Sequence, residues 1–514
     1  MEMFNILASD VAISLFGQTF DVSLNWIGNL IRLLITGIGS VGVGIILFSL
    51  ILKVIVLPFD IYQRIAMRKQ NIQMKDNQEK MQKLQKQYAN DKNMYNQKVM
   101  EMYKQNGFSM FSSCLPMILS LVIFFVAINA FNAYSQYSNV ENYNTMVRAY
   151  NAKMEEFCVD LDDTDTSFTL ETITSTTGEG EEQTTVTVHS LVVKSSTDDI
   201  YYKVQLTDAE KTQLESATDA DKKTFAQNAT HDKLTYFIKA EAANKPEIAQ
   251  FIQDKHKAYN EAIEGDACVS TEECTGKYNE NGVCDTCHLE HSKPFDKDEA
   301  LEDYFTEQAQ AAVVQSYKTE VAPNTKFLWI KNIWATDASY KHPVLPYADF
   351  KGEISREKFE VNETEVKFDT INKYTNAYDE YAYNEITGML DEQKTQANGY
   401  FVLIVLSIGT ILLQQFVSMR TQKEQQKYST VDGQGGSQQK MMMIVMTLMF
   451  AVFSFMYSSS FSIYMIMSNL FSLVSMLIIN KLVDISMAKK ERKALQEKYN
   501  KRFPGRNANG KGKK

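Results

Sequence analysis

The chain has 514 residues, 44% of them hydrophobic, with a formal net charge of −10 and a mean hydropathy of −0.28. These averages describe an ordinary soluble protein, but residues 134–396 hold 50 of the 63 acidic residues and only 25 of the 53 basic ones. Such a split excludes a uniform soluble domain and predicts an acidic soluble domain inserted into a basic membrane protein.

Four long segments carry almost no charge. Residues 33–59 contain Lys53 alone, residues 105–140 and 395–419 contain no charged side chain, and Met441–Asn480 extends for 40 residues without one. A helix needs about 20 residues to cross a bilayer, so the last segment is long enough for two crossings. The sequence therefore predicts five transmembrane helices, because helices satisfy their own backbone groups in lipid.

Basic residues outnumber acidic ones in the segments that follow the first, third and fifth predicted spans, which is the pattern of cytoplasmic segments. The N-terminus and the acidic insert are then outside a bacterial plasma membrane, and the C-terminus is inside. The predicted organisation is an N-terminus with an interfacial helix (1–38), a first span (39–60), a cytoplasmic helical hairpin (61–107) with its turn at 89–91, a second span (108–133), the acidic extracytoplasmic domain (134–396), a third span (397–419), a cytoplasmic loop (420–440), a fourth span (441–457), a fifth span (461–480) and a basic tail (481–514).

The insert shows its own periodicities. Alternation of Thr with Val over 166–206 predicts strands, whereas 207–264 and 296–321 are predicted to be helical. The expected fold is an α-helical integral membrane protein with a five-helix core, a cytoplasmic hairpin and an inserted α+β extracytoplasmic domain.

Lys53 is the most informative residue of the predicted spans. An ammonium group near mid-membrane costs roughly 2.5–3.5 kcal/mol, so such a charge usually has a function. The alternative is that the long side chain extends to the cytosolic headgroups, since Asp60 follows seven residues later, about 10 Å along a helix.

Four cysteines form a cluster in the insert: Cys268, Cys274, Cys284 and Cys287. Their spacing fits a structural zinc ion, and outside a cell it fits two disulfides equally well. The run Cys284-Asp-Thr-Cys287-His288 also matches the short c-type haem attachment pattern, without an evident axial partner. Zinc or disulfides would staple a small subdomain and would not be catalytic.

Several short motifs in the membrane portion are similar to one family. They are Gly44–Pro58 with Lys53, Met81–Asp91, Gly107 with Cys114-Leu-Pro116, Phe327–Ile330 with Asp337, Leu413-Gln-Gln415 and Tyr464–Asn469. In these motifs the chain resembles the YidC/Oxa1/Alb3 family of membrane protein insertases. Lys53 stands where that family usually has Arg, Met465 stands where a Trp is common, and the large insert has no counterpart in simple relatives.

The resemblance implies a hydrophilic groove that is open to cytosol and lipid and closed to the outside. Lys53 would attract acidic tails of incoming chains there, and the apolar segment would then move into lipid. The polar residues expected to line the groove are Ser120, Gln414, Gln415, Ser418, Ser454 and Ser468. For each serine the alternative is a hydroxyl bonded to its own helix backbone.

The expected function is that of a membrane protein insertase and chaperone that acts on nascent membrane proteins within lipid, with the ribosome and the Sec translocon as further partners and no DNA. No cofactor is required, and an enzyme is not expected, because no acid, base and nucleophile converge in the sequence. The alternatives are a transporter or channel with Lys53 at its substrate site, and a surface receptor that works through residues 134–396.

Overall fold

The computed structural model describes residues 9–105, 110–177, 184–270, 274–291, 294–361, 363–421 and 435–502, without the side chains of 67, 70–78, 92, 103–105, 110–121, 176–177, 184–185, 435–440, 442–443, 446 and 491. The chain divides into two compact units. The sheet unit comprises residues 1–23, 139–323 and 344–393, and the helical unit comprises 24–138, 324–343 and 394–514.

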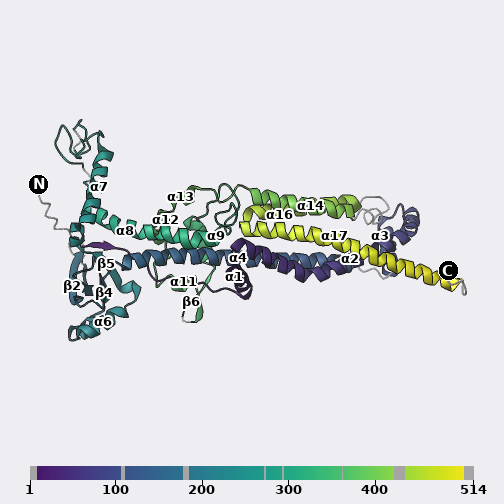
Figure 1. Cartoon of the computed structure of the whole chain (residues 1–514), viewed down its shortest axis with the longest axis horizontal. Coiled ribbons are helices and arrows are strands. Elements are labelled where there is room, and N and C mark those ends of the chain that lie inside the picture. Colours follow the sequence, from purple (N-terminus) through teal and green to yellow (C-terminus); the bar gives the residue numbers. More distant parts are fainter. Residues whose placement is uncertain are drawn as a thin grey trace, which may run out of the picture. The chain divides into compact units, whose positions relative to one another are not determined.

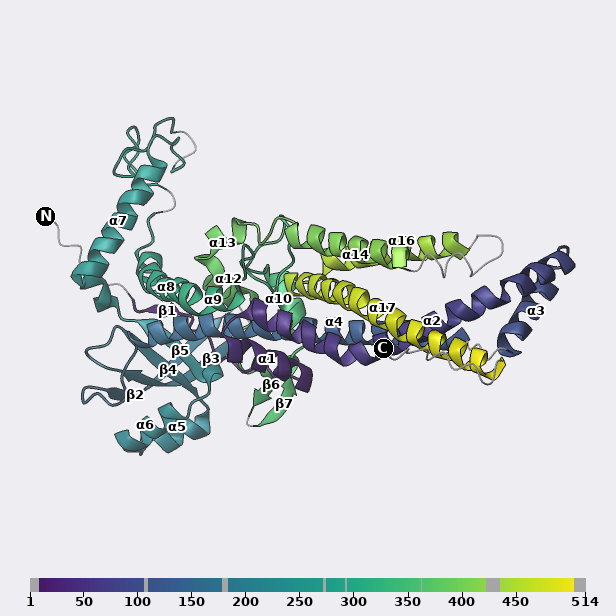
Figure 2. The ribbon, with the colours of Figure 1, turned by 45° about the vertical axis from the view of Figure 1, so that its right-hand side comes forward.

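A five-stranded antiparallel sheet organises the sheet unit (Figure 2), with α5 (Asp208–Glu215) and α6 (Asp219–Gln227) packed against it. The strand order is β1-β5-β4-β3-β2, with β1 Val11–Ile13, β2 Ser167–Thr177, β3 Thr184–Lys194, β4 Ile200–Leu206 and β5 Leu234–Ile238. The strands expected over 166–206 are thus β2 to β4. The expectation of helices throughout 207–264 is wrong at β5, whose aromatic and apolar residues pair with both β4 and β1.

Alternation along β3 and β4 explains which face of the sheet is covered. Leu191 and Val193 on β3 and Val204 on β4 are fully buried in one apolar cluster with Leu214 of α5. Because side chains in a strand point alternately to opposite faces, these residues define the covered face of the sheet.

A second core of the sheet unit is aromatic and surrounds the end of α4 (Met110–Glu155). Tyr143 of α4 packs against Phe350 and Tyr383, with ring centroids 4.8 and 5.2 Å away. Its hydroxyl donates to the carbonyl oxygen of Ala377 at 2.5 Å, so this buried phenol keeps a hydrogen-bond partner.

The sheet unit also contains the following elements, of which α10 and α12 supply Phe350 and Tyr383 of the aromatic core. They are η2 His231–Lys233, η3 Ala240–Asn244, α7 Pro246–Ile263, α8 Lys297–Ser316, η4 Tyr317–Val321, α9 Ala322–Thr325, α10 Tyr347–Ile354, the hairpin β6 Lys358–Val361 and β7 Thr364–Lys367, α11 Phe368–Ile371, α12 Glu380–Gly388 and α13 Asp391–Thr395, of which α9 and α13 end in the helical unit.

Long helices form the helical unit, and Figure 1 shows α14, α16 and α17 alongside one another. The helices are α1 Trp26–Ile38, α2 Val41–Gln87, α3 Lys92–Gln105, the first part of α4, α14 Val402–Thr421, α16 Gly435–Met456 and α17 Ser459–Arg502. Helices α2 and α3 meet at residues 88–91, where the turn of the cytoplasmic hairpin was expected.

Three helices of the described chain are long and apolar enough to cross a membrane: α2 over Val41–Ala66, α14 over Val402–Thr421 and α17 within Ser459–Arg502. The expected spans 108–133 and 441–457 coincide with parts of α4 and α16. Many side chains of these two segments lie outside the described residues. The chain is therefore a mostly helical membrane protein, and five crossings stay a prediction.

Residues 324–343 connect the N-terminal ends of α14 and α17. The backbone N–H of Ser459, at the start of α17, donates to the carbonyl oxygen of Ala335 at 2.8 Å. The Asp337 carboxylate accepts the N–H groups of Leu403 and Ile404, at 2.5 and 3.3 Å, and thereby caps α14. A Cβ at Gly399 would collide with this carboxylate, so glycine leaves the space that it occupies.

Removing the cap at α14 should destabilise the helical unit. Asp337 is 1% exposed, so Asp337→Ala leaves two N–H groups without their acceptor at a cost of about 1–3 kcal/mol. Thermal unfolding of the full chain in detergent should show a lower midpoint for this variant and a smaller loss for Asp337→Asn, which keeps one oxygen. An unchanged midpoint for Asp337→Ala would show that the cap contributes no stability.

A buried carboxyl in α10 should make stability depend on pH. Burial raises the pKa of Glu353 to about 7, while the Asn139 side chain donates to its Oε2 at 2.9 Å. Because the folded pKa exceeds the ordinary value of 4.5, the folded state loses stability as pH rises from about 4.5 to 7.

The variant Glu353→Gln should therefore match the parent chain at pH 5 and unfold at a higher temperature at pH 8. Glu365→Gln is the matched control. Hydrogen bonds from Lys358 and Ser23 lower the pKa of the Glu365 carboxyl, so the contribution of this group to stability changes with pH in the opposite direction. A constant difference between parent and Glu353→Gln at both pH values would contradict this assignment.

Candidate functional site

Lys53 lies on α2 at the border between a buried and an exposed face. Ser49, one turn earlier, is fully buried and donates to the carbonyl oxygen of Ile45 at 2.7 Å. Val54 and Ile55, which follow Lys53, are 56% and 58% exposed, as expected of side chains that face lipid. Lys53 itself is half-buried.

Charged side chains continue from Lys53 toward the C-terminal end of α2. Asp60, two turns later, interacts electrostatically with both Lys53 and Arg64. Within the described chain Asp60 is the one charged group that acts on Lys53, which takes part in no hydrogen bond there. The Lys53 ammonium group therefore keeps donors available for a further anion.

Helices α2 and α17 run parallel in a fixed register. Arg64 Nη1 donates to Asn480 Oδ1 at 3.0 Å, and four residues later Arg68 pairs with Asp484 at 3.4 Å. The partners are 416 residues apart in the hydrogen-bonded pair, and the ion pair has the same offset. Because both helices rise by about 1.5 Å per residue, this offset places Asn469 at the depth of Lys53.

At the depth of Lys53, Asn469 connects α17 to a third helix, α14. Its side chain is 9% exposed, and its Nδ2 donates to Thr410 Oγ1 of α14 at 3.3 Å. Neither residue was among the predicted groove residues, although Asn469 ends the motif Tyr464–Asn469. The signal was available for Asn469, because a carboxamide within the charge-free segment 441–480 stands out for the same reason as Gln414.

The predicted groove residues divide into two groups. Gln415 Oε1 accepts from Thr447 Oγ1 at 3.0 Å, and Ser454 Oγ lies 3.0 Å from Ser407 Oγ, so these two side chains join α14 to α16. Each such bond between membrane helices contributes on average about 0.6 kcal/mol. Ser454 also donates to the carbonyl oxygen of Phe450 at 3.0 Å, as the backbone alternative expected.

The other predicted residues are not part of these interhelical bonds. Gln414 and Ser418 on α14 are half-buried, and Ser468, beside Asn469, is 5% exposed and hydrogen-bonded to Tyr464. The side chain of Ser120 lies outside the described residues. The helical unit thus places Ser468 and Asn469 at the level of Lys53 by register, with Gln414 one turn beyond Thr410.

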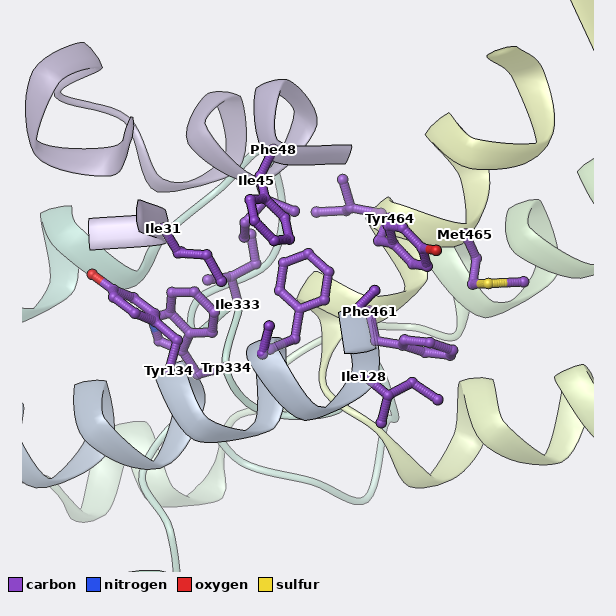
Figure 3. Packing of buried hydrophobic residues seen from close by; sticks show 14 of the residues in the cluster. Ile31, Ile45, Phe48, Ile128, Tyr134, Ile333, Trp334, Phe461, Tyr464 and Met465 are labelled. Carbon is purple, nitrogen blue, oxygen red and sulfur yellow. The ribbon is translucent and has the colours of Figure 1, made fainter. Parts of the chain in front are cut away.

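An aromatic cluster fills the helical unit on the N-terminal side of Lys53 (Figure 3). Phe48, five residues before Lys53, contacts Phe131 of α4 edge-on at 5.4 Å, and Phe131 contacts Tyr464 of α17 at 5.6 Å. Trp334, from the segment 324–343, packs on Tyr134 at 4.9 Å. The surroundings of Lys53 are therefore apolar toward the start of α2, and polar and charged toward its end.

The cysteine cluster is a separate site in the sheet unit. The sulfur atoms of Cys268, Cys274, Cys284 and Cys287 all lie within 4.8 Å of one another. His288 and His291 are not members of this cluster, and His291 packs on Tyr278 with ring centroids 4.8 Å apart.

Comparisons with known proteins agree with the helical unit. The family model described as 60Kd inner membrane protein matches residues 33–195 and 312–490, which leaves 196–311, including the cysteine cluster, outside. Proteins named membrane protein insertase YidC are 34% identical over 98 residues in Caldanaerobacter subterraneus subsp. tengcongensis and 35% identical over 88 residues in Fusobacterium nucleatum subsp. nucleatum.

These alignments cover 19% and 17% of this chain, and 46% and 41% of the two relatives. The chain thus spans less than half the length of these curated relatives. No solved structure matches it. Since the family model covers well over half of the residues, the chain belongs to the 60Kd inner membrane protein family, the YidC/Oxa1 family.

Proposed function

We propose that this protein is a membrane protein insertase that moves short polar tails of nascent proteins across a bacterial inner membrane. The observation that carries the proposal is the half-buried Lys53 on an apolar helix, next to polar side chains on one side and an aromatic cluster on the other. The name of the relatives, membrane protein insertase, agrees with this use of the site.

The proposed topology has five crossings, contributed by α2, α4, α14, α16 and α17. The parallel register of α2 and α17 supports it, since two helices that both enter from the outside must run in the same direction. The N-terminus is then outside and the C-terminus is in the cytoplasm. Basic residues in the last part of α17, such as Lys489, Lys490 and Arg492, agree with a cytoplasmic end.

The proposed mechanism lowers the cost of bringing polar groups into lipid. Water that reaches Lys53 from the charged end of α2 would let an incoming tail keep its hydrogen bonds over part of the bilayer. The Lys53 ammonium group then attracts carboxylates of the tail, while Thr410, Gln414 and Asn469 offer hydrogen bonds at nearby depths. The aromatic cluster keeps the outer side closed, so ions do not leak.

Release needs no nucleotide in this scheme. As the hydrophobic segment behind the tail moves past the exposed Val54 and Ile55 into lipid, burial of its apolar surface contributes about 25 cal/mol per Å². The protein acts as a binding surface and chaperone, without a chemical step. The hairpin of α2 and α3, together with the basic end of α17, would contact the ribosome, and the Sec translocon is a further proposed partner.

Changing the charge at Lys53 should impair insertion of substrates with acidic outer tails. One ion pair at 4 Å is worth about 4 kcal/mol at an effective dielectric constant of about 20, and loss of a third of this slows insertion about tenfold. In proteoliposomes, Lys53→Ala should therefore insert such substrates about tenfold more slowly, Lys53→Glu should be slower still, and Lys53→Arg should be active.

Lys69→Ala is the matched control for this experiment, because Lys69 is an exposed lysine farther along the same helix. A substrate with an uncharged tail should be inserted equally by all of these variants. If Lys53→Ala and Lys53→Glu insert acidic tails at the parental rate, the charge has no part in the mechanism. A cysteine at position 53 that stays unlabelled by a water-soluble thiol reagent would exclude the hydrated groove.

Insertion should survive removal of most of the sheet unit. The Phe157 ring lies 5.0 Å from Phe305, which is eight residues, or about 12 Å, into α8. A flexible linker of about eight residues, with a root-mean-square span of about 16 Å, can therefore replace 159–295. The shortened chain should complement an insertase-depleted strain, and the same chain with Lys53→Glu should fail. Loss of complementation by a shortened chain that accumulates normally in the membrane would place an essential step in the sheet unit.

A further inference from the structure

The cysteine cluster lies in a part of the chain that the family model does not match. It follows α7 in the sheet unit and lies within 196–311, outside the residues matched by the family model. Short antiparallel bridges order the loop, pairing Ala267 with Lys277, Tyr278 with Cys284, and Val283 with Glu290. These bridges bring the two cysteine pairs of the sequence to one point.

All four sulfur atoms converge, which distinguishes this cluster from two separate disulfides. Cys268 Sγ and Cys287 Sγ are 3.5 Å apart, as are Cys274 Sγ and Cys284 Sγ, and every pair is within 4.8 Å. Tetrahedral ligands at about 2.3 Å from a zinc ion lie about 3.8 Å from each other. A disulfide would need about 2.05 Å within each pair and gives no reason for the two pairs to meet.

Backbone N–H groups point at three of the sulfur atoms. Ser270 donates to Cys268 Sγ, Gly276 to Cys274 Sγ and Leu289 to Cys287 Sγ, in each case from two residues after the cysteine. Such donors stabilise thiolates and orient metal ligands. The left-handed conformation of His288, with φ of 59°, precedes the Leu289 donor.

The backbone also approaches the cluster too closely for a side chain at one position. A Cβ at Gly276 would lie 2.6 Å from Cys284 Sγ. The same Cβ would lie 2.5 Å from Asp285 Oδ1 and from Thr286 Oγ1, so a larger residue at 276 would displace Cys284 together with these two neighbours.

Among the described residues of the loop, the buried apolar cluster is small. Its buried cluster contains Cys268, Cys284 and Tyr278, and the partly buried residues around them are Ile263, Cys274 and Cys287. Four of the six members are cysteines. A small module with so little apolar surface usually depends on a metal ion or disulfides.

We propose that Cys268, Cys274, Cys284 and Cys287 bind one structural zinc ion that holds this loop together. Four thiolates in a tetrahedral arrangement suit zinc, and a closed four-sulfur site leaves no open position for catalysis. Binding releases protons from the thiols into solvent and involves no change of oxidation state.

Metal analysis of the full chain purified in detergent tests the proposal, and it does not depend on insertion activity. We expect about one zinc per chain, released when a mercurial reagent titrates the thiols. Cys284→Ser and the fourfold serine variant should retain less than about a tenth of this zinc. Gly276→Ala should lose its zinc to a chelator faster than the parent chain.

Cys158→Ser is the matched control, because Cys158 belongs to the same unit but not to the cluster. Burial raises the pKa of the Cys158 thiol to about 12, which keeps it protonated, and its replacement should leave the zinc content unchanged. Because misfolding alone would also remove zinc from the serine variants, a second measurement uses the parent chain. There, alkylation of four thiols should become fast only after a chelator is added.

Three results would overturn the proposal. If the chain contains no metal and its thiols react only after a reductant is added, the four cysteines form two disulfides. Iron with its thiolate charge-transfer absorption would show a different metal. Zinc retained by the fourfold serine variant would place the ion elsewhere.

Discussion

The parallel contact between α2 and α17 sets the depth of the polar groups in the helical unit. A charged pair and a carboxamide–guanidinium hydrogen bond fix the register at one end, through Arg68 with Asp484 and Arg64 with Asn480. At the other end Phe48 and Tyr464 belong to one buried cluster and have the same offset in sequence. Between these ends, the level of Lys53 is matched by Asn469, which in turn is bonded to α14.

This arrangement separates two requirements that oppose each other in a membrane. A cation needs hydration or polar neighbours, and a seal against ion leakage needs close apolar packing. Along α2 these two requirements are met by different segments. The aromatic cluster precedes Lys53, and the charged residues Asp60 and Arg64 follow it. The segment 324–343 completes the apolar end, since Phe327 lies against Gly42 and Trp334 against Tyr134.

The sheet unit is stabilised by different contacts from those of the helical unit. Its stability comes from an antiparallel sheet, an aromatic core around Tyr143 and, as proposed, a metal staple in the loop after α7. Residues 11–13 contribute the edge strand β1 through pairing with β5. The sheet therefore contains one strand from before α2 and four strands from after α4, which makes the unit discontinuous in sequence.

The sequence by itself determined the features that depend on local composition. The charge split, the apolar segments, the hairpin turn near residue 90, the strands over 166–206 and the family motifs were all readable, because span length, charge bias and alternation are local properties. Lys53 could be identified from the sequence for the same reason, because it is the one charged residue in an apolar segment.

Only the tertiary structure decided which distant residues meet. It paired β1 with β5, capped α14 with Asp337, and placed Asn469 rather than the predicted Ser468 in the bond from α17 to α14. It also directed Gln415 and Ser454 into bonds between helices and brought four cysteines within 4.8 Å. Helix register and strand pairing depend on packing between segments hundreds of residues apart, and neither periodicity nor spacing along a single chain contains that information.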